Sequence, residues 1–126
     1  MGIYGNTAVE VVKNYSDGQD LHIEWSNQVS KFTSSKSSIE KSCPKCTFLG
    51  LCEEGLVVGI PKRKYLDLGN KNKNHAIMLY RIFKKKSELS SCELHKLYVI
   101  ERGASLTNNG QADILVSLYK ENLLNE

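Results

Sequence analysis

The sequence predicts an all-α fold, a single domain built as an irregular bundle of five or six helices. Apolar residues recur at helical spacing in most segments of the chain, and the alternation of apolar and polar residues that marks a half-buried strand is nearly absent. Of the 126 residues, 40% are hydrophobic and 25% are charged, which is typical of one globular core and not of a disordered or fibrous chain. We therefore predict one domain over residues 1–126.

Two helices are predicted in the N-terminal part of the chain. Asn6 or Thr7 is expected to cap the first helix, and the second begins near Asp20, because short polar side chains accept hydrogen bonds from the free amides of a first turn. Their buried faces follow from the spacing i, i+3, i+4, i+7. The expected core residues are Ala8, Val11, Val12 and Tyr15 in the first helix and Leu21, Trp25, Val29 and Phe32 in the second. A serine-rich connection then spans residues 33–42, with Ser37 and Glu40 placed to cap a single turn.

The segment from Ser42 to Pro61 is the most distinctive part of the sequence, with three of the four cysteines and both prolines. We predict a third helix here, from Cys43 to about Val57, with Ser42 as its N-cap. Glycine in a helix interior costs about 1 kcal/mol relative to alanine, so Gly50 and Gly55 indicate close approach of another element. The expected core residues are Cys46, Phe48, Leu49, Leu51 and Cys52.

The second half of the chain begins with a basic loop over residues 60–74, in which Tyr65, Leu66 and Leu68 are expected to serve as anchors. Asn74 is expected to cap a fourth helix over residues 75–86. Its predicted core stripe is Ala76, Leu79, Tyr80 and Phe83, widened by Ile77, Met78 and Ile82. Ser90 or Ser91 can cap the segment 92–102, whose pattern fits a helix or a strand. A last helix is predicted from Gln111 to Leu124, with Ile114, Leu115, Leu118, Tyr119 and Leu123 buried.

Two stretches resemble a known family. They are F-L-G-L-C-E-E-G-L-V-V-G-I-P-K at Phe48–Lys62 and N-G-Q-A-D-I-L-V-S-L-Y at Asn109–Tyr119, with N-K-N-H-A between them. They resemble a family of small bacterial and phage-associated proteins known only as a domain of unknown function. The resemblance implies a compact fold over most of the chain, and it implies no reaction.

The cysteines allow one metal site. Cys43 and Cys46 have the spacing at which two thiolates bind one zinc ion, and Cys92 with His95 could complete a tetrahedron. We favour the alternative, in which the four cysteines are reduced and pack as small apolar residues. No cofactor is therefore expected, with zinc as the alternative. A glutaredoxin-type use of the Cys-Pro-Lys-Cys motif would need a buried strand before it, and the residues before Cys43 are serine and lysine.

No catalytic motif occurs: the sequence lacks a P-loop, GxGxxG, HExxH and GxSxG. Glu53 and Glu54 are adjacent, so on a helix they diverge by about 100°, which is poor geometry for an acid/base pair. One of them is expected to face solvent, and the other to act as a cap or to pair with a basic residue of the stretch 62–64. The sequence thus nominates no catalytic residue and favours a protein that is not an enzyme, while leaving enzymatic activity open.

The charge distribution is the remaining functional signal. Residues 60–86 hold nine basic side chains and one acidic, a net charge of +8; because the whole chain carries +3, the remainder carries −5. Basic residues and one tyrosine that could stack on a base form the candidate surface: Lys62, Arg63, Lys64, Tyr65, Lys71, Lys73 and Arg81.

We therefore predict a non-enzymatic cytoplasmic binding module that engages an acidic partner, protein or nucleic acid, through the basic surface between Ile60 and Lys86. The alternatives are a zinc-stabilised nucleic-acid-binding regulator and a phage-encoded inhibitor of a host nucleic-acid enzyme. The cytoplasm is expected because the sequence starts without the pattern of a signal peptide, and no membrane association is expected because no apolar run approaches about 18 residues.

Overall fold

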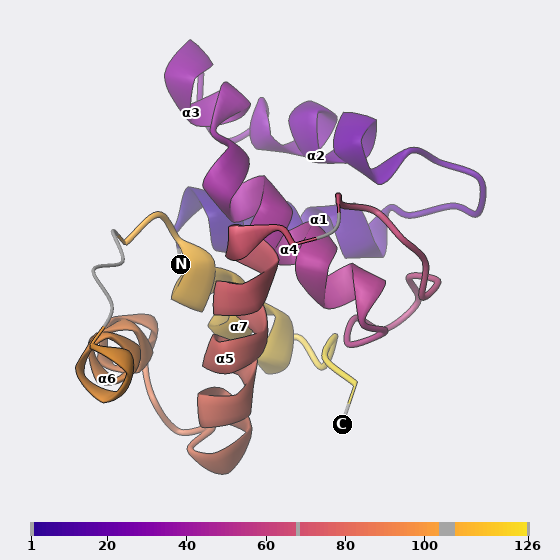
Figure 1. Cartoon of the computed structure of the whole chain (residues 1–126). Helices are drawn as coiled ribbons and strands as arrows, with labels where there is room; N and C mark the ends of the chain where they lie inside the picture. The colour runs from indigo at the N-terminus through magenta and orange to yellow at the C-terminus, as the bar shows by residue number, and fades with distance from the viewer. Residues whose placement is uncertain (1, 68, 104–107, 126) are drawn as a thin grey trace.

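The computed structural model describes residues 2–67, 69–103 and 108–125, and within these ranges the chain forms seven helices and no strand (Figure 1). The helices are α1 (Ile3–Lys13), α2 (Leu21–Val29), α3 (Lys36–Glu40), α4 (Ser42–Glu53), α5 (Lys71–Lys85), α6 (Ser91–Arg102) and α7 (Gln111–Lys120). The predicted all-α class and single domain are confirmed, and the short helix α3 is the single turn expected in the serine-rich connection. Leu68, an expected anchor, lies outside the described residues. None of the described helices combines the length and apolarity needed to cross a membrane.

Helix α4 lies at the centre of the molecule. Figure 1 shows α2 and α3 on one side of it and α5 and α7 on the other, and α4 packs against α2, α5 and α7. All seven residues from Cys46 to Cys52 are buried, which is the condition of a helix surrounded on all sides. The cysteines predicted to pack in the core, Cys46 and Cys52, are 9% and 0% exposed. The Ser42–Pro61 segment thus supplies the helix around which the others pack.

An aromatic cluster joins α4 to the N-terminal helices. The ring of Trp25 lies between those of Tyr4 and Phe48, with centroids 6.4 and 5.5 Å away. Because the Trp25 ring on α2 contacts both Tyr4 on α1 and Phe48 on α4, this cluster fixes the three helices relative to one another. Two aromatic residues predicted to be buried are exposed. Phe32 is 38% exposed because α2 ends at Val29, and Tyr119 is 45% exposed, with its ring edge-on to Phe83.

Helices α1 and α7 lie side by side and run in the same direction. At their starts, Asp113 Oδ2 on α7 accepts hydrogen bonds from the amides of Gly2 and Gly5, each 3.0 Å long, and at their ends Lys13 pairs with Glu121 at 2.8 Å. Helix α1 begins at Ile3, earlier than the predicted caps at Asn6 or Thr7, and its N-cap residue has no side chain. An aspartate from another helix therefore satisfies the amides that a local cap would bind.

The segment 92–102, for which the sequence left helix and strand open, is helical. Ser90 and Glu93 form a capping box at the start of α6: the Ser90 hydroxyl accepts from the amide of Glu93, and the Glu93 carboxylate accepts from the amide of Ser90. Leu94 and Tyr98, one turn apart, face the core. The strong start signal and the helical spacing of these two residues outweigh the β-branched pair Val99-Ile100.

Asp113→Ala is expected to lower the free energy of unfolding by about 1–2 kcal/mol, because two amides of α1 lose their acceptor. The measurement is urea unfolding followed by circular dichroism. Glu88→Ala, which removes an exposed carboxylate from the loop before α6, is the control and should change the free energy by less than about 0.5 kcal/mol. Equal effects of the two substitutions would contradict the capping role.

Candidate functional site

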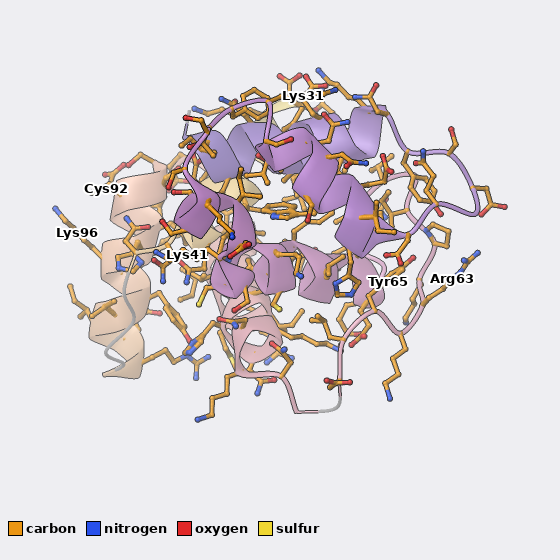
Figure 2. The ribbon with its side chains drawn as sticks, turned by 90° about the horizontal axis from the view of Figure 1, so that it is seen from above. Lys31, Lys41, Arg63, Tyr65, Cys92 and Lys96 are labelled. Atoms are coloured by element: carbon orange, nitrogen blue, oxygen red, sulfur yellow. The ribbon has the colours of Figure 1, made fainter. Side chains whose placement is uncertain are left out.

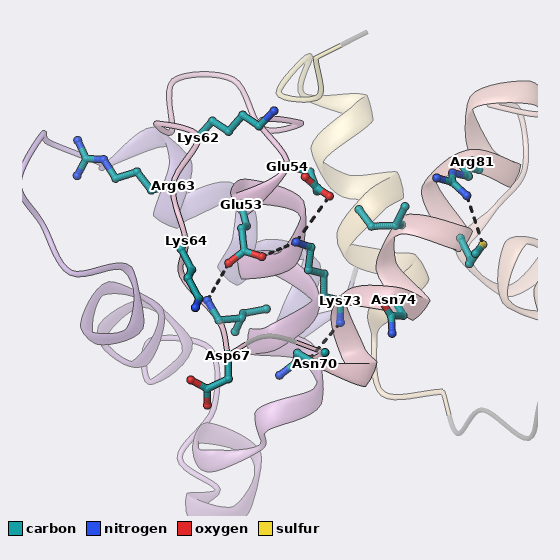
Figure 3. A pocket seen from close by; sticks show the side chains of 14 residues that line it. Glu53, Glu54, Lys62, Arg63, Lys64, Asp67, Asn70, Lys73, Asn74 and Arg81 are labelled. Carbon is teal, nitrogen blue, oxygen red and sulfur yellow. Dashed lines mark hydrogen bonds and ion pairs between the residues drawn. The ribbon is translucent and has the colours of Figure 1, made fainter.

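A cleft of about 810 Å³ opens beside α5. In Figure 3 the segment from Lys62 to Asp67 passes along one side of it and α5 bounds the other, while the end of α4 supplies Glu53 and Glu54 between them. Aliphatic surface comes from Leu66, Ile77 and Met78. Five basic and three acidic side chains also line the cleft, a net charge of +2: Lys62, Arg63, Lys64, Lys73 and Arg81 against Glu53, Glu54 and Asp67.

The end of α4 sets the position of the two glutamates. The helix ends at Glu53, earlier than the predicted end near Val57, because Gly55 adopts a left-handed conformation with φ +73°. The two hydrogen bonds of a Schellman motif close it, from Gly55 N to Cys52 O and from Leu56 N to Leu51 O, both 3.0 Å long. Gly55 thus ends the helix where the sequence predicted it inside one. The chain turns away from α4 directly after the paired glutamates.

Helix α5 starts earlier than predicted, and this moves two of the candidate basic residues from the loop into a helix. Its N-cap is Asn70, whose Oδ1 accepts hydrogen bonds from the amides of Asn72 at 2.9 Å and Lys73 at 3.2 Å, so Asn74 is not the cap. The predicted basic loop over residues 60–74 is therefore shorter, and Lys71 and Lys73 lie in the first turn of α5.

Gly50 brings this first turn against α4. A Cβ atom built at Gly50 would lie 2.9 Å from the Cα of Lys73, which is too close for any side chain. The predicted close approach of another element is confirmed at this glycine. It places the stem of Lys73 on α4, one turn before Glu53.

The Glu53 carboxylate joins all three walls of the cleft. Its Oε1 accepts hydrogen bonds from the amides of Tyr65 at 2.8 Å and Leu66 at 3.0 Å, and its Oε2 binds the ammonium of Lys73 (Figure 3). Glu54 lies 3.6 Å from the same ammonium. The expected pairing of a glutamate with the stretch 62–64 is therefore wrong: the cation is Lys73, and the loop is held through its amides.

The pKa values of the central pair are shifted in opposite directions. Burial acts to raise the pKa of Glu53, but the hydrogen bonds from Lys73 and from two backbone amides outweigh it and hold that pKa below its usual value. The hydrogen bond to Glu53 raises the pKa of Lys73, against a smaller opposing effect of burial. Both groups therefore stay charged at neutral pH, and the pair is suited to holding structure together and poorly suited to proton transfer.

The structure brings five of the seven predicted binding residues to this cleft. Lys62, Arg63, Lys64, Lys73 and Arg81 line it, whereas Tyr65 and Lys71 do not. Two of the five have other contacts as well. Arg63 points away from the Glu53–Lys73 pair in Figure 3, with its guanidinium 3.6 Å from Asp17, and Arg81 lies 3.9 Å from the sulfur of Met78.

Tyr65 serves as an anchor and is not presented for stacking on a base. Its hydroxyl donates a 2.6 Å hydrogen bond to the carbonyl of Pro61, and its ring packs against the core, while Arg63 extends outward at the edge of the molecule (Figure 2). Burial raises the pKa of this phenol. Leu66, the other anchor that the structure describes, is 7% exposed. Tyr65 and Leu66 directly follow Lys64, so they hold this end of the basic stretch to the body of the protein.

The four candidate zinc ligands are not gathered into a site. Cys43 and Cys46 lie on α4, whereas Cys92 and His95 lie on α6, and Cys92 is exposed on the outer side of α6 in Figure 2. Within residues 2–67, 69–103 and 108–125, no three His, Cys, Asp or Glu side chains are close enough to hold a metal ion together. Helix α4 packs against α2, α5 and α7, and this arrangement separates the two halves of the predicted tetrahedron.

The fold and the cleft define a small all-α protein with a mixed but predominantly basic cleft beside α5. The sequence profile of the family of unknown function DUF6979 matches residues 1–125, and the chain belongs to this family. No curated protein and no solved structure matches the chain significantly. The resemblance noted from Phe48–Lys62 and Asn109–Tyr119 is thus confirmed in its coarser part, membership of a family of unknown function.

Glu53→Gln tests the central pair. Glutamine keeps a carbonyl oxygen for the two amides but loses the charge that binds Lys73, so the free energy of unfolding at pH 7 should fall by about 1–3 kcal/mol. Because folding lowers the pKa of Glu53, the carboxylate stabilises the native state above its unfolded pKa of about 4.3, and this stabilisation is lost as the pH falls through the lower folded value.

The difference in free energy of unfolding between the wild-type protein and Glu53→Gln should therefore shrink in urea titrations carried from pH 7 down to pH 3. Glu54→Gln is the matched control, since Glu54 is 43% exposed and its contact with Lys73 is longer; its effect should stay below about 0.5 kcal/mol. If the loss of unfolding free energy caused by Glu53→Gln does not change with pH, the charge of Glu53 is not what stabilises the fold.

Proposed function

We propose that the protein is a non-enzymatic binding module that engages an anionic partner through the cleft beside α5. The observation that carries the proposal is the convergence of basic residues from two separate segments, Lys62–Lys64 and Arg81, on one cleft with a net positive lining. Clefts lined mainly by one sign of charge concentrate ligands of the opposite sign and speed their association. A solvated run of lysines on a convex surface would not supply this geometry.

The ion pairs within the cleft favour binding over catalysis. Lys73 is held by Glu53 and Glu54, so it offsets one of their two negative charges and is engaged within the protein. The cations left at the cleft are Lys62, Arg63, Lys64 and Arg81, and the three of the first stretch are exposed. Exposed cations on a fixed backbone are suited to contact carboxylates or phosphates of a partner. We retain as part of this proposal the cytoplasmic location and the bacterial or phage origin expected from the sequence.

The triple variant Lys62→Ala, Arg63→Ala, Lys64→Ala is expected to elute from heparin at clearly lower salt than the wild-type protein, because three of the cleft's cations are lost. The same comparison with a duplex DNA column tests a second polyanion. Circular dichroism should show an unchanged helix content, since the three side chains are exposed and lie outside the helices.

The triple variant Lys84→Ala, Lys85→Ala, Lys86→Ala is the matched control. It removes the same charge from the exposed C-terminal end of α5, away from this cleft, and should elute close to the wild-type protein. An equal shift for the two triple variants would mean that net charge alone governs retention, and it would contradict a localised site.

A further inference from the structure

The basic stretch that walls the cleft has free backbone groups. Within the described part of the chain, the amide and carbonyl groups of Lys62, Arg63 and Lys64 make no hydrogen bond with other protein groups. The neighbouring groups are bonded: Pro61 O accepts from the Tyr65 hydroxyl, and Tyr65 O lies 3.0 Å from Nε2 of His22. Three consecutive peptide groups thus remain open to a partner, as on the edge strand of a sheet.

This open stretch is pinned at both ends. Ile60 on one side is 6% exposed, and Leu66 on the other is 7% exposed. The amides of Tyr65 and Leu66 are held by Glu53, as described above. A partner that pairs with the stretch therefore meets a backbone that is already placed, which reduces the entropy lost on binding.

Part of the surface across from this stretch is aliphatic, at Ile77 and Met78 of α5, and Leu66 at the end of the stretch itself adjoins it. Leu66, Ile77 and Met78 line the cleft, and no aromatic ring stands among its described lining residues. Single-stranded nucleic acid is bound by stacking bases on aromatic side chains, and Tyr65, the aromatic residue of the predicted basic surface, is committed to Pro61 and the core. A flexible thioether beside branched side chains is suited to receive an apolar side chain of a peptide.

The mixture of acidic and basic side chains in the cleft also favours a peptide over a nucleic acid. A phosphate backbone carries charge at every unit and would meet Glu54 and Asp67 in the lining as well as the cations. A peptide can place its carboxylates opposite Lys62, Lys64 and Arg81 and its uncharged residues elsewhere. The mixed lining thus matches a ligand whose charge is distributed unevenly along its length.

We propose that the cleft binds an acidic peptide segment of a partner protein, which lies alongside Lys62–Lys64, pairs its backbone with theirs and seats an apolar side chain on Leu66, Ile77 and Met78. This mode is β-augmentation: backbone hydrogen bonds provide affinity, and alternate side chains of the peptide enter the cleft and provide specificity. The inference rests on the proposed function of the cleft and names the chemical class of its partner.

The test uses the whole chain and four fluorescein-labelled probes in an anisotropy titration. The first probe is a nine-residue peptide that alternates glutamate with leucine. The second has serine in place of leucine, and the third is the first peptide with every second backbone nitrogen methylated to block pairing. The fourth is oligodeoxythymidylate of equal net charge. The expected order is that the glutamate–leucine peptide binds at least tenfold more tightly than each of the other three.

The protein variants tie binding to the cleft. The 62–64 triple alanine variant should bind the glutamate–leucine peptide at least tenfold more weakly than the wild-type protein does. The affinity of the 84–86 triple alanine variant should fall less than twofold. Ile77→Ser should lower the affinity for the glutamate–leucine peptide and leave the affinity for the glutamate–serine peptide unchanged, because only the first peptide uses the aliphatic surface. On binding, the NMR resonances of the Lys62, Arg63 and Lys64 amides should shift, and their hydrogen exchange should slow.

The outcomes distinguish the two proposals. Tight binding of the oligonucleotide that depends on Lys62–Lys64, with weak binding of every peptide, overturns the peptide inference and leaves the anionic-partner proposal standing. Equal affinity for the leucine, serine and methylated peptides also overturns the inference, because charge alone would then explain binding. Absence of binding by all four probes at low salt overturns both.

Discussion

The carboxylate of Glu53 is the contact on which the candidate site depends. Three parts of the chain that are distant in sequence meet at its two oxygens: the end of α4, the amides at residues 65 and 66, and the ammonium of Lys73 on α5. A carboxylate that accepts two backbone amides and one ammonium is fully satisfied, so its burial beside the core is compensated. Without it, the basic stretch would lose the contacts that join it to α4 and α5 through the amides of Tyr65 and Leu66.

The ends of the same region are fixed by close packing and by the C-terminal tail. Gly50 allows the backbone of α5 to touch α4, and this close contact fixes the position along α4 at which Lys73 meets Glu53. Residues 123–125 run antiparallel to residues 56–58, with Val58 N bonded to Leu123 O and Asn125 N to Leu56 O. These backbone hydrogen bonds hold the turn after α4 against the C-terminal residues, so the basic stretch leaves the turn in a defined direction. The cleft is a product of the whole fold and not of its lining residues alone.

Most of the fold follows from local patterns in the sequence. Helical spacing was sufficient to place five of the six longer helices and most of the core, including Trp25, Phe48 and the buried cysteines, but it left α6 open between helix and strand. Several helix ends were misplaced, and the end of α4 and the start of α5 show the physical reason. Gly55 reads equally as an interior glycine or as the left-handed residue after a helix, and Asn70 and Asn74 are equally good caps for α5. Tertiary contacts decide both, and a single sequence does not contain them.

The candidate site was predictable in outline only. The run of cations at 62–64 and its excess of positive charge are visible in the sequence, and five of the seven expected residues line the cleft. The role of Tyr65 and the partner of Glu53 depend on how a loop folds back on a helix, which periodicity does not report. The zinc hypothesis rested on spacing within two helices that do not pack closely together. Spacing along the chain brings ligands together only when the fold does the same.

The most direct test of this account is native-state hydrogen exchange of the Tyr65 and Leu66 amides, measured by NMR in the wild-type protein and in Glu53→Ala, with the Leu49 amide inside α4 as the internal reference. Both loop amides should be protected in the wild-type protein and exchange far faster in the variant, while Leu49 remains protected. Equal protection of Tyr65 and Leu66 in the two proteins would contradict it, because the basic stretch would then be held in place without Glu53.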